Sequence, residues 1–301
     1  MPRFKVPSVD LLLLSVTLVW GFNFAIMKGL YRYFHPFAFN ALRFTLTSVT
    51  MLAILKAAGK PLRVDRADLP AVAGLALVST TAYHFLFSLG LAHTLAGNSA
   101  VVMAFSPIFA YGMGVLLQRE KPSALVAGGI ALSAAGVVAI AASSPRGLAL
   151  GGSWRGDLLT LGAAFCWGFY TGSSGRLLEK YGTLRLTVLV MVIGTVFLVP
   201  LSLPWVLRQD WRHITLPIWC SILYSAFLSI VYCYFAWFYA LGRVGIARTA
   251  VYSNVTPVVA FVGGWLLLGE RPGIGQAVGA ALVLTGVFLV RRRRPVEAPD
   301  E

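Results

Sequence analysis

Ten long apolar segments, separated by short polar stretches, run along almost the whole chain. They cover residues 9–30, 37–56, 70–92, 97–118, 123–142, 157–177, 184–206, 215–241, 246–268 and 274–290. Each is close to the ~20 residues that an α-helix needs to cross a bilayer. The breaks hold turn formers and charges, such as His35-Pro36 and Arg271-Pro272-Gly273. The pattern predicts an all-α polytopic membrane protein with ten transmembrane helices and no soluble domain.

An internal repeat relates the two halves of the chain. Residues 10–22 read DLLLLSVTLVWGF and residues 157–169 read DLLTLGAAFCWGF, with 7 of 13 positions identical. Residues 105–122 and 255–272 share 7 of 18 positions, among them a Pro and a final Glu-(Lys/Arg)-Pro. The offsets of 147 and 150 residues indicate one duplication with a small insertion. Because each half holds five spans, an odd number, the copies enter the membrane in opposite directions.

The fold class expected is therefore ten transmembrane helices arranged as two inverted five-helix repeats. The predicted repeats cover residues 1–145 and 154–292, and residues 293–301 form a short cytoplasmic tail. Inverted repeats are characteristic of secondary transporters, whose halves exchange conformations around a site near the membrane midplane.

Composition and charge agree with a chain solvated by lipid. The 301 residues are 58% hydrophobic and only 12% charged, about half the charge of a soluble domain. The net charge of +14 would suggest nucleic acid in a soluble protein. With the N-terminus inside, however, 17 Lys and Arg residues fall on the cytoplasmic side and 7 outside, which is the distribution that fixes topology. Both termini are therefore expected in the cytoplasm, and no nucleic acid is expected as a partner.

Cysteine and histidine usage argues against metal, cofactor and enzyme chemistry. Cys166, Cys220 and Cys233 lie in or beside apolar segments without paired spacing, so buried small hydrophobes are expected rather than a disulfide or zinc site. The four histidines lie on different segments: His35, His84, His93 and His213. A membrane enzyme would need a catalytic cluster, and none is visible. The first apolar run lacks a small-residue cleavage site, so it is expected to be a span rather than a signal peptide.

The paired Trp-Gly motifs, Ala-Leu-Arg-Phe at 41–44 and the paired Pro…Glu-(Lys/Arg)-Pro endings together resemble the EamA-type family of the drug/metabolite transporter superfamily. The resemblance covers nearly the whole chain, and YddG-like amino-acid exporters are the most similar members. It implies export of aromatic or neutral amino acids across a bacterial inner membrane by alternating access. The export is expected to be facilitative. The alternative is export of other small metabolites or drugs, such as nucleosides, with or without proton coupling. It also implies a cavity lined mainly by spans 1, 3, 4, 6, 8 and 9.

Two faces of the repeat-related first and sixth spans are candidate cavity walls. Trp20 and Asn23 share one face, and Trp167, Tyr170 and Ser174 share the corresponding face of the sixth span. An amide in the hydrocarbon core is costly unless it faces protein or water. The alternative is that Asn23 and Ser174 hydrogen-bond neighbouring helices while the aromatic rings pack.

Further substrate-binding candidates lie on the third, fourth, eighth and ninth spans. His84 is the only histidine well inside a span, Tyr83 precedes it, and Tyr234 is its repeat mate. An imidazole can contact a carboxylate or gate the cavity, or it can form an interhelical hydrogen bond. Asn98 begins the fourth span, and Tyr252 lies near the start of the ninth.

Five residues are candidates for gating or structural roles. Pro107 and Pro257 lie within repeat-related spans, where proline permits a hinge but is also common in static membrane helices. Arg43 lies within the second span. A structural role is favoured, at helix-end carbonyls or paired with Asp10 or Glu120, over binding a substrate carboxylate. Glu120 and Glu270 close equivalent spans, where anchoring of a loop is favoured.

The eleven acidic residues all lie outside the middle of the spans. Proton-driven exporters of cationic drugs rely on an intramembrane carboxylate, so facilitated diffusion of neutral, zwitterionic or mildly anionic molecules is expected, or else coupling through His84. The expected partners are this small-molecule substrate and the lipid bilayer. The sequence leaves the oligomeric state open, and a monomer would suffice.

Overall fold

The computed structural model describes residues 8–94, 96–143, 154–212, 214–259 and 273–292, with the side chains of residues 96–98 excepted. All regular elements in these ranges are helices. They follow one another as α1 (Val9–Leu30), α2 (Pro36–Ala57), α3 (Leu69–Ala76), the π-helix η1 (Leu77–Ala82), α4 (Tyr83–His93), α5 (Ala96–Met103), α6 (Ser106–Leu116), α7 (Ala124–Ala142), α8 (Trp154–Ser173), α9 (Gly175–Arg208), α10 (Leu216–Leu223), the π-helix η2 (Tyr224–Tyr232), α11 (Cys233–Val244), α12 (Ile246–Ala250), the 3₁₀-helix η3 (Val251–Asn254) and α14 (Ile274–Arg292).

Eight helical stretches of the described chain are long and apolar enough to cross a membrane. Two more predicted spans fall below that measure. α8 has 20 residues, but ten of them are buried among other helices, so it needs fewer apolar side chains than a helix facing lipid. α12, η3 and residues 255–259 begin the ninth predicted span, whose remainder lies outside the described residues. The prediction of an all-helical, multi-pass membrane protein is confirmed.

Two helix boundaries show how local sequence fixes the elements. α2 begins with Pro36, whose fixed φ suits a first helical position, and His35 Nδ1 accepts a hydrogen bond from the Phe37 backbone N–H. α9 changes direction at Gly182, where φ is 71°. A residue without a Cβ adopts this left-handed region at little cost. The predicted seventh span, 184–206, therefore follows a separate short helical segment that ends at this kink.

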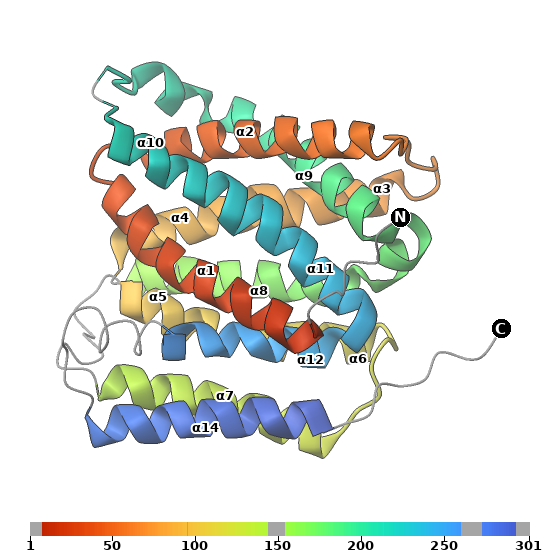
Figure 1. Ribbon diagram of the computed structural model, residues 1–301, viewed down its shortest axis with the longest axis vertical. Coiled ribbons are helices and arrows are strands. Elements are labelled where there is room, and N and C mark those ends of the chain that lie inside the picture. Colours follow the sequence, from red (N-terminus) through yellow and green to blue (C-terminus); the bar gives the residue numbers. More distant parts are fainter. Residues whose placement is uncertain (1–7, 95, 144–153, 213, 260–272, 293–301) are drawn as a thin grey trace.

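The inverted relation of the halves is visible where α7 and α14 lie side by side (Figure 1). A Cβ added to Gly129 would meet the Gly286 carbonyl oxygen at 2.9 Å, and one added to Gly136 would meet that of Gly279 at 2.6 Å. As numbers rise along α7 they fall along α14, so the helices are antiparallel. Gly279 and Gly286 are themselves the repeat mates of Gly129 and Gly136, 150 residues on. The twofold rotation that relates the two halves therefore converts the Gly129–Gly286 contact into the Gly279–Gly136 contact.

The other contacts between the halves are reciprocal as well. α1 packs against η2 and α11 of the second half, while its mate α8 packs against η1 and α4 of the first. Irregular helix geometry recurs at matching places. The π-helices η1 and η2 occupy equivalent parts of the third and eighth spans, and a turn at Ala104–Phe105 matches η3 in the ninth. Such departures from α-helix often mark functional positions.

The distribution of polarity is that of a protein in lipid. Large apolar side chains such as Leu18, Val196 and Leu284 are 48–63% exposed, whereas polar side chains such as Asn40, Ser79 and Thr171 are fully buried. Bilayer solvates the apolar surface, so polar groups find their partners inside.

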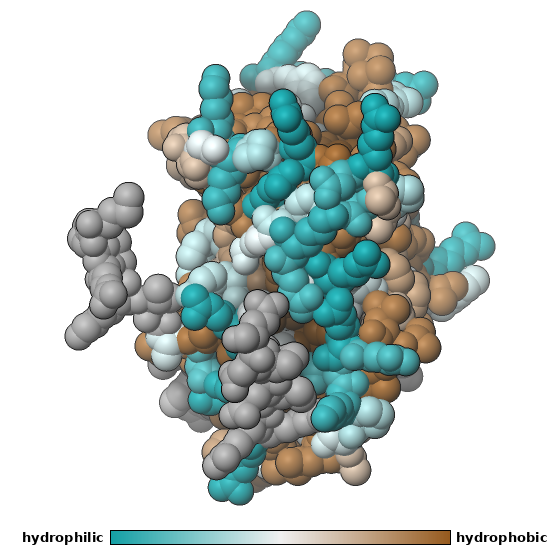
Figure 2. Space-filling model, turned by 90° about the vertical axis from the view of Figure 1, so that its right-hand side faces the viewer, coloured by the Kyte–Doolittle hydropathy of each residue, from teal (hydrophilic) through white to brown (hydrophobic). Residues whose placement is uncertain are grey.

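One end of the bundle carries both described ends of the chain. Arg291, near the end of α14, lies 2.6 Å from Asp10 at the start of α1. Hydrophilic side chains gather on this end face (Figure 2). Lys56 in the last turn of α2, and Lys60 and Arg63 after it, are exposed at the same end. This end is the one that the distribution of basic residues predicts to be cytoplasmic.

Candidate functional site

A cavity lies among the central helices, with an empty volume of about 710 Å³ when the space open to solvent is included. Its walls come from both halves of the chain and combine aromatic, apolar and neutral polar side chains with one guanidinium. The lining residues are Trp20, Asn23, Phe24, Met27, Arg43, Tyr83, His84, Phe87, Ala100, Met103, Ser106, Trp167, Ser229, Ile230, Tyr234, Ser253, Thr256 and Pro257. No acidic side chain is among them.

Two tryptophans, Trp20 and Trp167, line the cavity, and Trp237 packs against both of them. The ring centroids of Trp20 and Trp167, which are repeat mates, are 5.3 Å apart in an edge-to-face arrangement, and Trp237 lies 5.1 Å from Trp20. The Trp20 indole N–H donates to the Ser229 carbonyl at 2.9 Å. Because Ser229 belongs to the π-helix η2, this hydrogen bond fixes the orientation of the Trp20 indole against an irregular segment of helix. Tyr83 and Tyr234 extend the cluster, each about as close to Trp167.

Arg43, on α2, is 1% exposed and lies at the centre of a polar network. Nη1 donates to Ser225 Oγ at 2.9 Å and contacts Met27 Sδ at 3.2 Å. Nη2 donates to Asn40 Oδ1 at 3.0 Å and lies 3.3 Å from His84 Nδ1. His84 Nε2 in turn lies 3.0 Å from the Tyr234 hydroxyl. Arg43 thus joins helices of both halves, and its partners are neither Asp10 nor Glu120.

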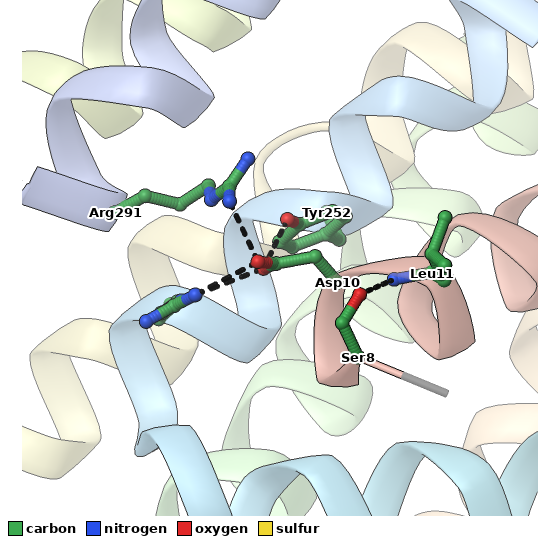
Figure 3. A network of polar contacts seen from close by, with 6 residues as sticks. Ser8, Asp10, Leu11, Tyr252 and Arg291 are labelled. Atoms are coloured by element: carbon green, nitrogen blue, oxygen red, sulfur yellow. Dashed lines mark hydrogen bonds and ion pairs between the residues drawn. The ribbon is translucent and has the colours of Figure 1, made fainter. Parts of the chain in front are cut away.

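A second network joins the halves at the end face that carries both described chain ends. Asp10 accepts hydrogen bonds from Arg248 Nη2 at 3.0 Å, from the Tyr252 hydroxyl at 2.6 Å and from Arg291 Nη2 at 2.6 Å. Figure 3 shows Tyr252 and Arg291 converging on this carboxylate beside the Ser8 cap of α1. At 1.5 Å per residue, this network lies ~15 Å along α1 from Trp20. It therefore ties α1 to η3 and α14 at one end, outside the cavity.

Comparison with known proteins decides the family. The model of the EamA-like transporter family matches residues 7–142 and again residues 154–292. The chain belongs to the EamA-like transporter family. The expectation drawn from the paired motifs is thereby confirmed, and this chain is a transporter rather than an enzyme.

Named relatives of this EamA-like chain include amino-acid exporters. It is 32% identical to a "Probable terminal-alkyne amino-acid exporter" of Streptantibioticus cattleyicolor, with 82% of each chain covered. It is 30% identical to an "Uncharacterized transporter" of Archaeoglobus fulgidus, over 94% of this chain and 98% of the other. It is 27% identical to a "Probable amino-acid metabolite efflux pump" of Salmonella typhimurium, over 92% and 93%. A solved crystal structure shares the fold, with a TM-score of 0.77 at 18% identity over 94% of this chain and 96% of the other.

The EamA-like fold brings six of the ten predicted substrate-binding residues to the cavity: Trp20, Asn23, Tyr83, His84, Trp167 and Tyr234. Three lie elsewhere. Tyr170 is buried against Phe238, and Ser174 precedes α9 with its hydroxyl on the Tyr170 carbonyl. Tyr252 bonds to Asp10. The side chain of Asn98 lies outside the described residues.

The predicted gating residues occupy different kinds of position. Pro107 stands in the first turn of α6, after the turn at Ala104–Phe105, and Pro257 lines the cavity. The Glu120 carboxylate accepts from the backbone N–H groups of Ile246 and Ala247 at 3.0 and 3.2 Å. It thus holds the loop after α6 against the start of α12. Glu270 lies outside the described residues.

Sequence periodicity missed Ser225 and Ser229 because the polar residues of the eighth span do not share one α-helical face. In the π-helix η2 each turn contains an extra residue, since hydrogen bonds run from i to i+5. The step of five from Ser229 to Tyr234 therefore brings both to the cavity. Phe24, Phe87 and Met103 were missed for another reason. An apolar residue facing the cavity has the same signature as one facing lipid.

Proposed function

We propose that this EamA-like protein exports amino acids with aromatic or other neutral side chains through the cavity between its inverted halves. The observation that carries the proposal is the composition of the cavity: among the described residues its lining has indole, phenol and phenyl rings, neutral polar groups and one guanidinium, with no carboxylate. A cationic drug would meet an unneutralised positive charge there. The two relatives named for amino-acid export and efflux support the same substrate class.

Transport in this proposal is facilitative. A proton-coupled exporter needs a group in the membrane that changes its charge during the cycle. His84 is the one imidazole among the described residues of the cavity wall, and its Nδ1 faces the Arg43 guanidinium at 3.3 Å. A second positive charge at that distance would be repelled. We therefore assign His84 a hydrogen-bonding role and expect flux down the substrate gradient alone.

Alternating access would use the two ends of the cavity in turn. The hydrogen bonds of Asp10 with Arg248, Tyr252 and Arg291 favour closure of the cavity at the end of the bundle that carries Asp10. We assign this end to the cytoplasmic side of a bacterial inner membrane. Pro107 and Pro257 would act as hinges, since each stands just after a break in regular α-helix, at the turn of Ala104–Phe105 and at η3.

The test is uptake of radiolabelled amino acids into proteoliposomes, with and without an imposed proton gradient. We expect phenylalanine, tryptophan or leucine to move without the gradient, and Trp20→Ala to abolish most of that flux. Tyr239→Phe is a matched aromatic control, since its ring packs on Arg243 and not on the cavity. Movement of a nucleoside or a cationic dye in place of every amino acid would refute the substrate assignment. A strict requirement for the gradient would refute facilitated diffusion.

A further inference from the structure

The Arg43 guanidinium is a buried positive charge in the cavity wall without a neutralising carboxylate among the described residues. Its hydrogen-bonding partners, Met27, Asn40, Ser225 and His84, are all neutral groups. The faces of two phenyl rings lie 5.1 Å from its central carbon, which offsets part of the cost of burial. A lone buried ion remains costly even when its donors are satisfied. The cavity therefore has a positive potential that an anionic group would neutralise.

The hydrogen bonds from Arg43 through His84 to Tyr234 have a fixed direction of donation. Arg43 Nη2 is a donor only, so His84 Nδ1 facing it must accept. The imidazole then carries its proton on Nε2 and donates it to the Tyr234 oxygen at 3.0 Å. The phenol proton of Tyr234 is left without an acceptor in the described part of the chain, and this side chain lines the cavity. Arg43 Nε also lacks a partner there. Arg43 Nε and the Tyr234 hydroxyl are thus two unused donors within one hydrogen-bonded network.

An unused acceptor lies close to these donors. Asn23 Oδ1 is buried in the cavity wall without a hydrogen-bond partner among the described residues. Asn23 Nδ2 and Arg43 Nη1 each lie 3.2 Å from Met27 Sδ, so these two nitrogens are separated by at most twice that distance. A buried acceptor without a partner costs free energy, which a ligand's ammonium group would recover. The Asn23 amide, with its unused acceptor, is therefore a neighbour of the Arg43 guanidinium in the same cavity wall.

We infer that Arg43 and Tyr234, joined and oriented by the hydrogen bonds of His84, form a carboxylate subsite and that the Asn23 carbonyl receives the adjacent ammonium group. The transported class is then zwitterionic α-amino acids with a free carboxylate, whose side chains lie among Trp20, Trp167 and the other rings. This inference rests on the proposed amino-acid transport and names the group by which the substrate is recognised. Arg43 acquires a direct binding role in addition to its contacts between helices.

The experiment measures binding of four radiolabelled probes to the full-length protein in detergent. Phenylalanine carries both charges, phenylalaninamide and phenethylamine lack the carboxylate, and 3-phenylpropionate lacks the amine. We expect phenylalanine to bind about tenfold or more tightly than phenylalaninamide, the difference of one hydrogen-bonded charge. Equal binding of phenylalanine and phenethylamine overturns the carboxylate subsite while amino-acid transport stands. If 3-phenylpropionate binds and phenylalanine does not, the carboxylate subsite is supported and amino-acid transport is refuted. If none of the four probes binds, both are refuted.

Two variants locate the recognition. Tyr234→Phe removes one oxygen and should reduce the preference for phenylalanine over its amide about tenfold, leaving the affinity for the amide unchanged. Arg43→Gln should abolish the preference, and size-exclusion and melting profiles show whether it remains folded. Tyr239→Phe, on the same helix as Tyr234 but packed on Arg243, is the matched control and should retain the full preference. A preference that survives in folded Tyr234→Phe overturns the assignment of the phenol, and survival in both variants overturns the subsite.

Discussion

The contact between α7 and α14 makes opposite predictions for one substitution at two glycines of the same helix. A Cβ added to Gly136 would lie 2.6 Å from the Gly279 carbonyl oxygen and 2.7 Å from the Val283 backbone nitrogen. A Cβ added to Gly128 would have no heavy atom within 4 Å. Both positions are interior to α7, so the change in helix propensity is the same. Gly128→Ala is therefore an internal control for Gly136→Ala.

The size of the effect follows from these distances. Ordinary contact begins at 3.4 Å, so Gly136→Ala would require the helices to separate by up to 0.8 Å (3.4 minus 2.6 Å). The obstructing atoms belong to the backbone and cannot rotate away. Overpacking of this kind costs about 1–3 kcal/mol, whereas replacing Gly by Ala in a helix gains up to about 1 kcal/mol. Net destabilisation of about 1–2 kcal/mol is expected at Gly136, and a small stabilisation at Gly128.

Thermal melting of purified protein in detergent, followed by tryptophan fluorescence, measures the difference. Gly136→Ala should lower the melting temperature by several degrees, at about 2–4 °C per kcal/mol for a chain of this size class. Gly128→Ala should leave it unchanged or raise it slightly. Equal melting temperatures for the two variants would refute the close approach of α7 and α14, and with it the antiparallel contact that relates the halves.

Three further predictions concern the ends and the centre of the bundle. In a double-mutant cycle on melting, Asp10→Asn and Arg248→Gln should show a coupling of about 1 kcal/mol or more; simple additivity would mean that they do not interact. Trp20→Ala should reduce uptake more than it reduces stability, because the ring is part of the cavity wall, and a loss of both in proportion would indicate packing alone. The hydrogen bond from Lys180 holds the pKa of Asp68 below its ordinary value of 3.8, so its contribution is complete above that pH and is lost as the pH falls through the lowered pKa. Melting curves should therefore lose stability at acidic pH in wild type and less in Asp68→Asn; parallel curves would show that Asp68 makes no such contribution.

The sequence by itself determined the class of protein and most helix boundaries. Apolar segments must be about as long as the bilayer is thick, so their lengths and breaks located nearly every span within a few residues. The paired motifs around Trp20 and Trp167, and around Pro107 and Pro257, indicated two halves. The odd number of spans in each half then required opposite orientation. These conclusions depend on local composition and on counting, both of which a single sequence contains.

The tertiary structure alone decided which polar side chains meet. Arg43 was expected at a helix end or beside Asp10 or Glu120, but a guanidinium reaches many positions, and only the packed helices bring it to Ser225 and His84. The π-helix η2 shifted Ser229 and Tyr234 onto one face, contrary to α-helical periodicity. Tyr252 was expected in the cavity, yet a carboxylate 242 residues away holds its hydroxyl. Helix periodicity gives the direction of a side chain only while the helix stays regular, and the partner in that direction belongs to another segment that local sequence does not specify.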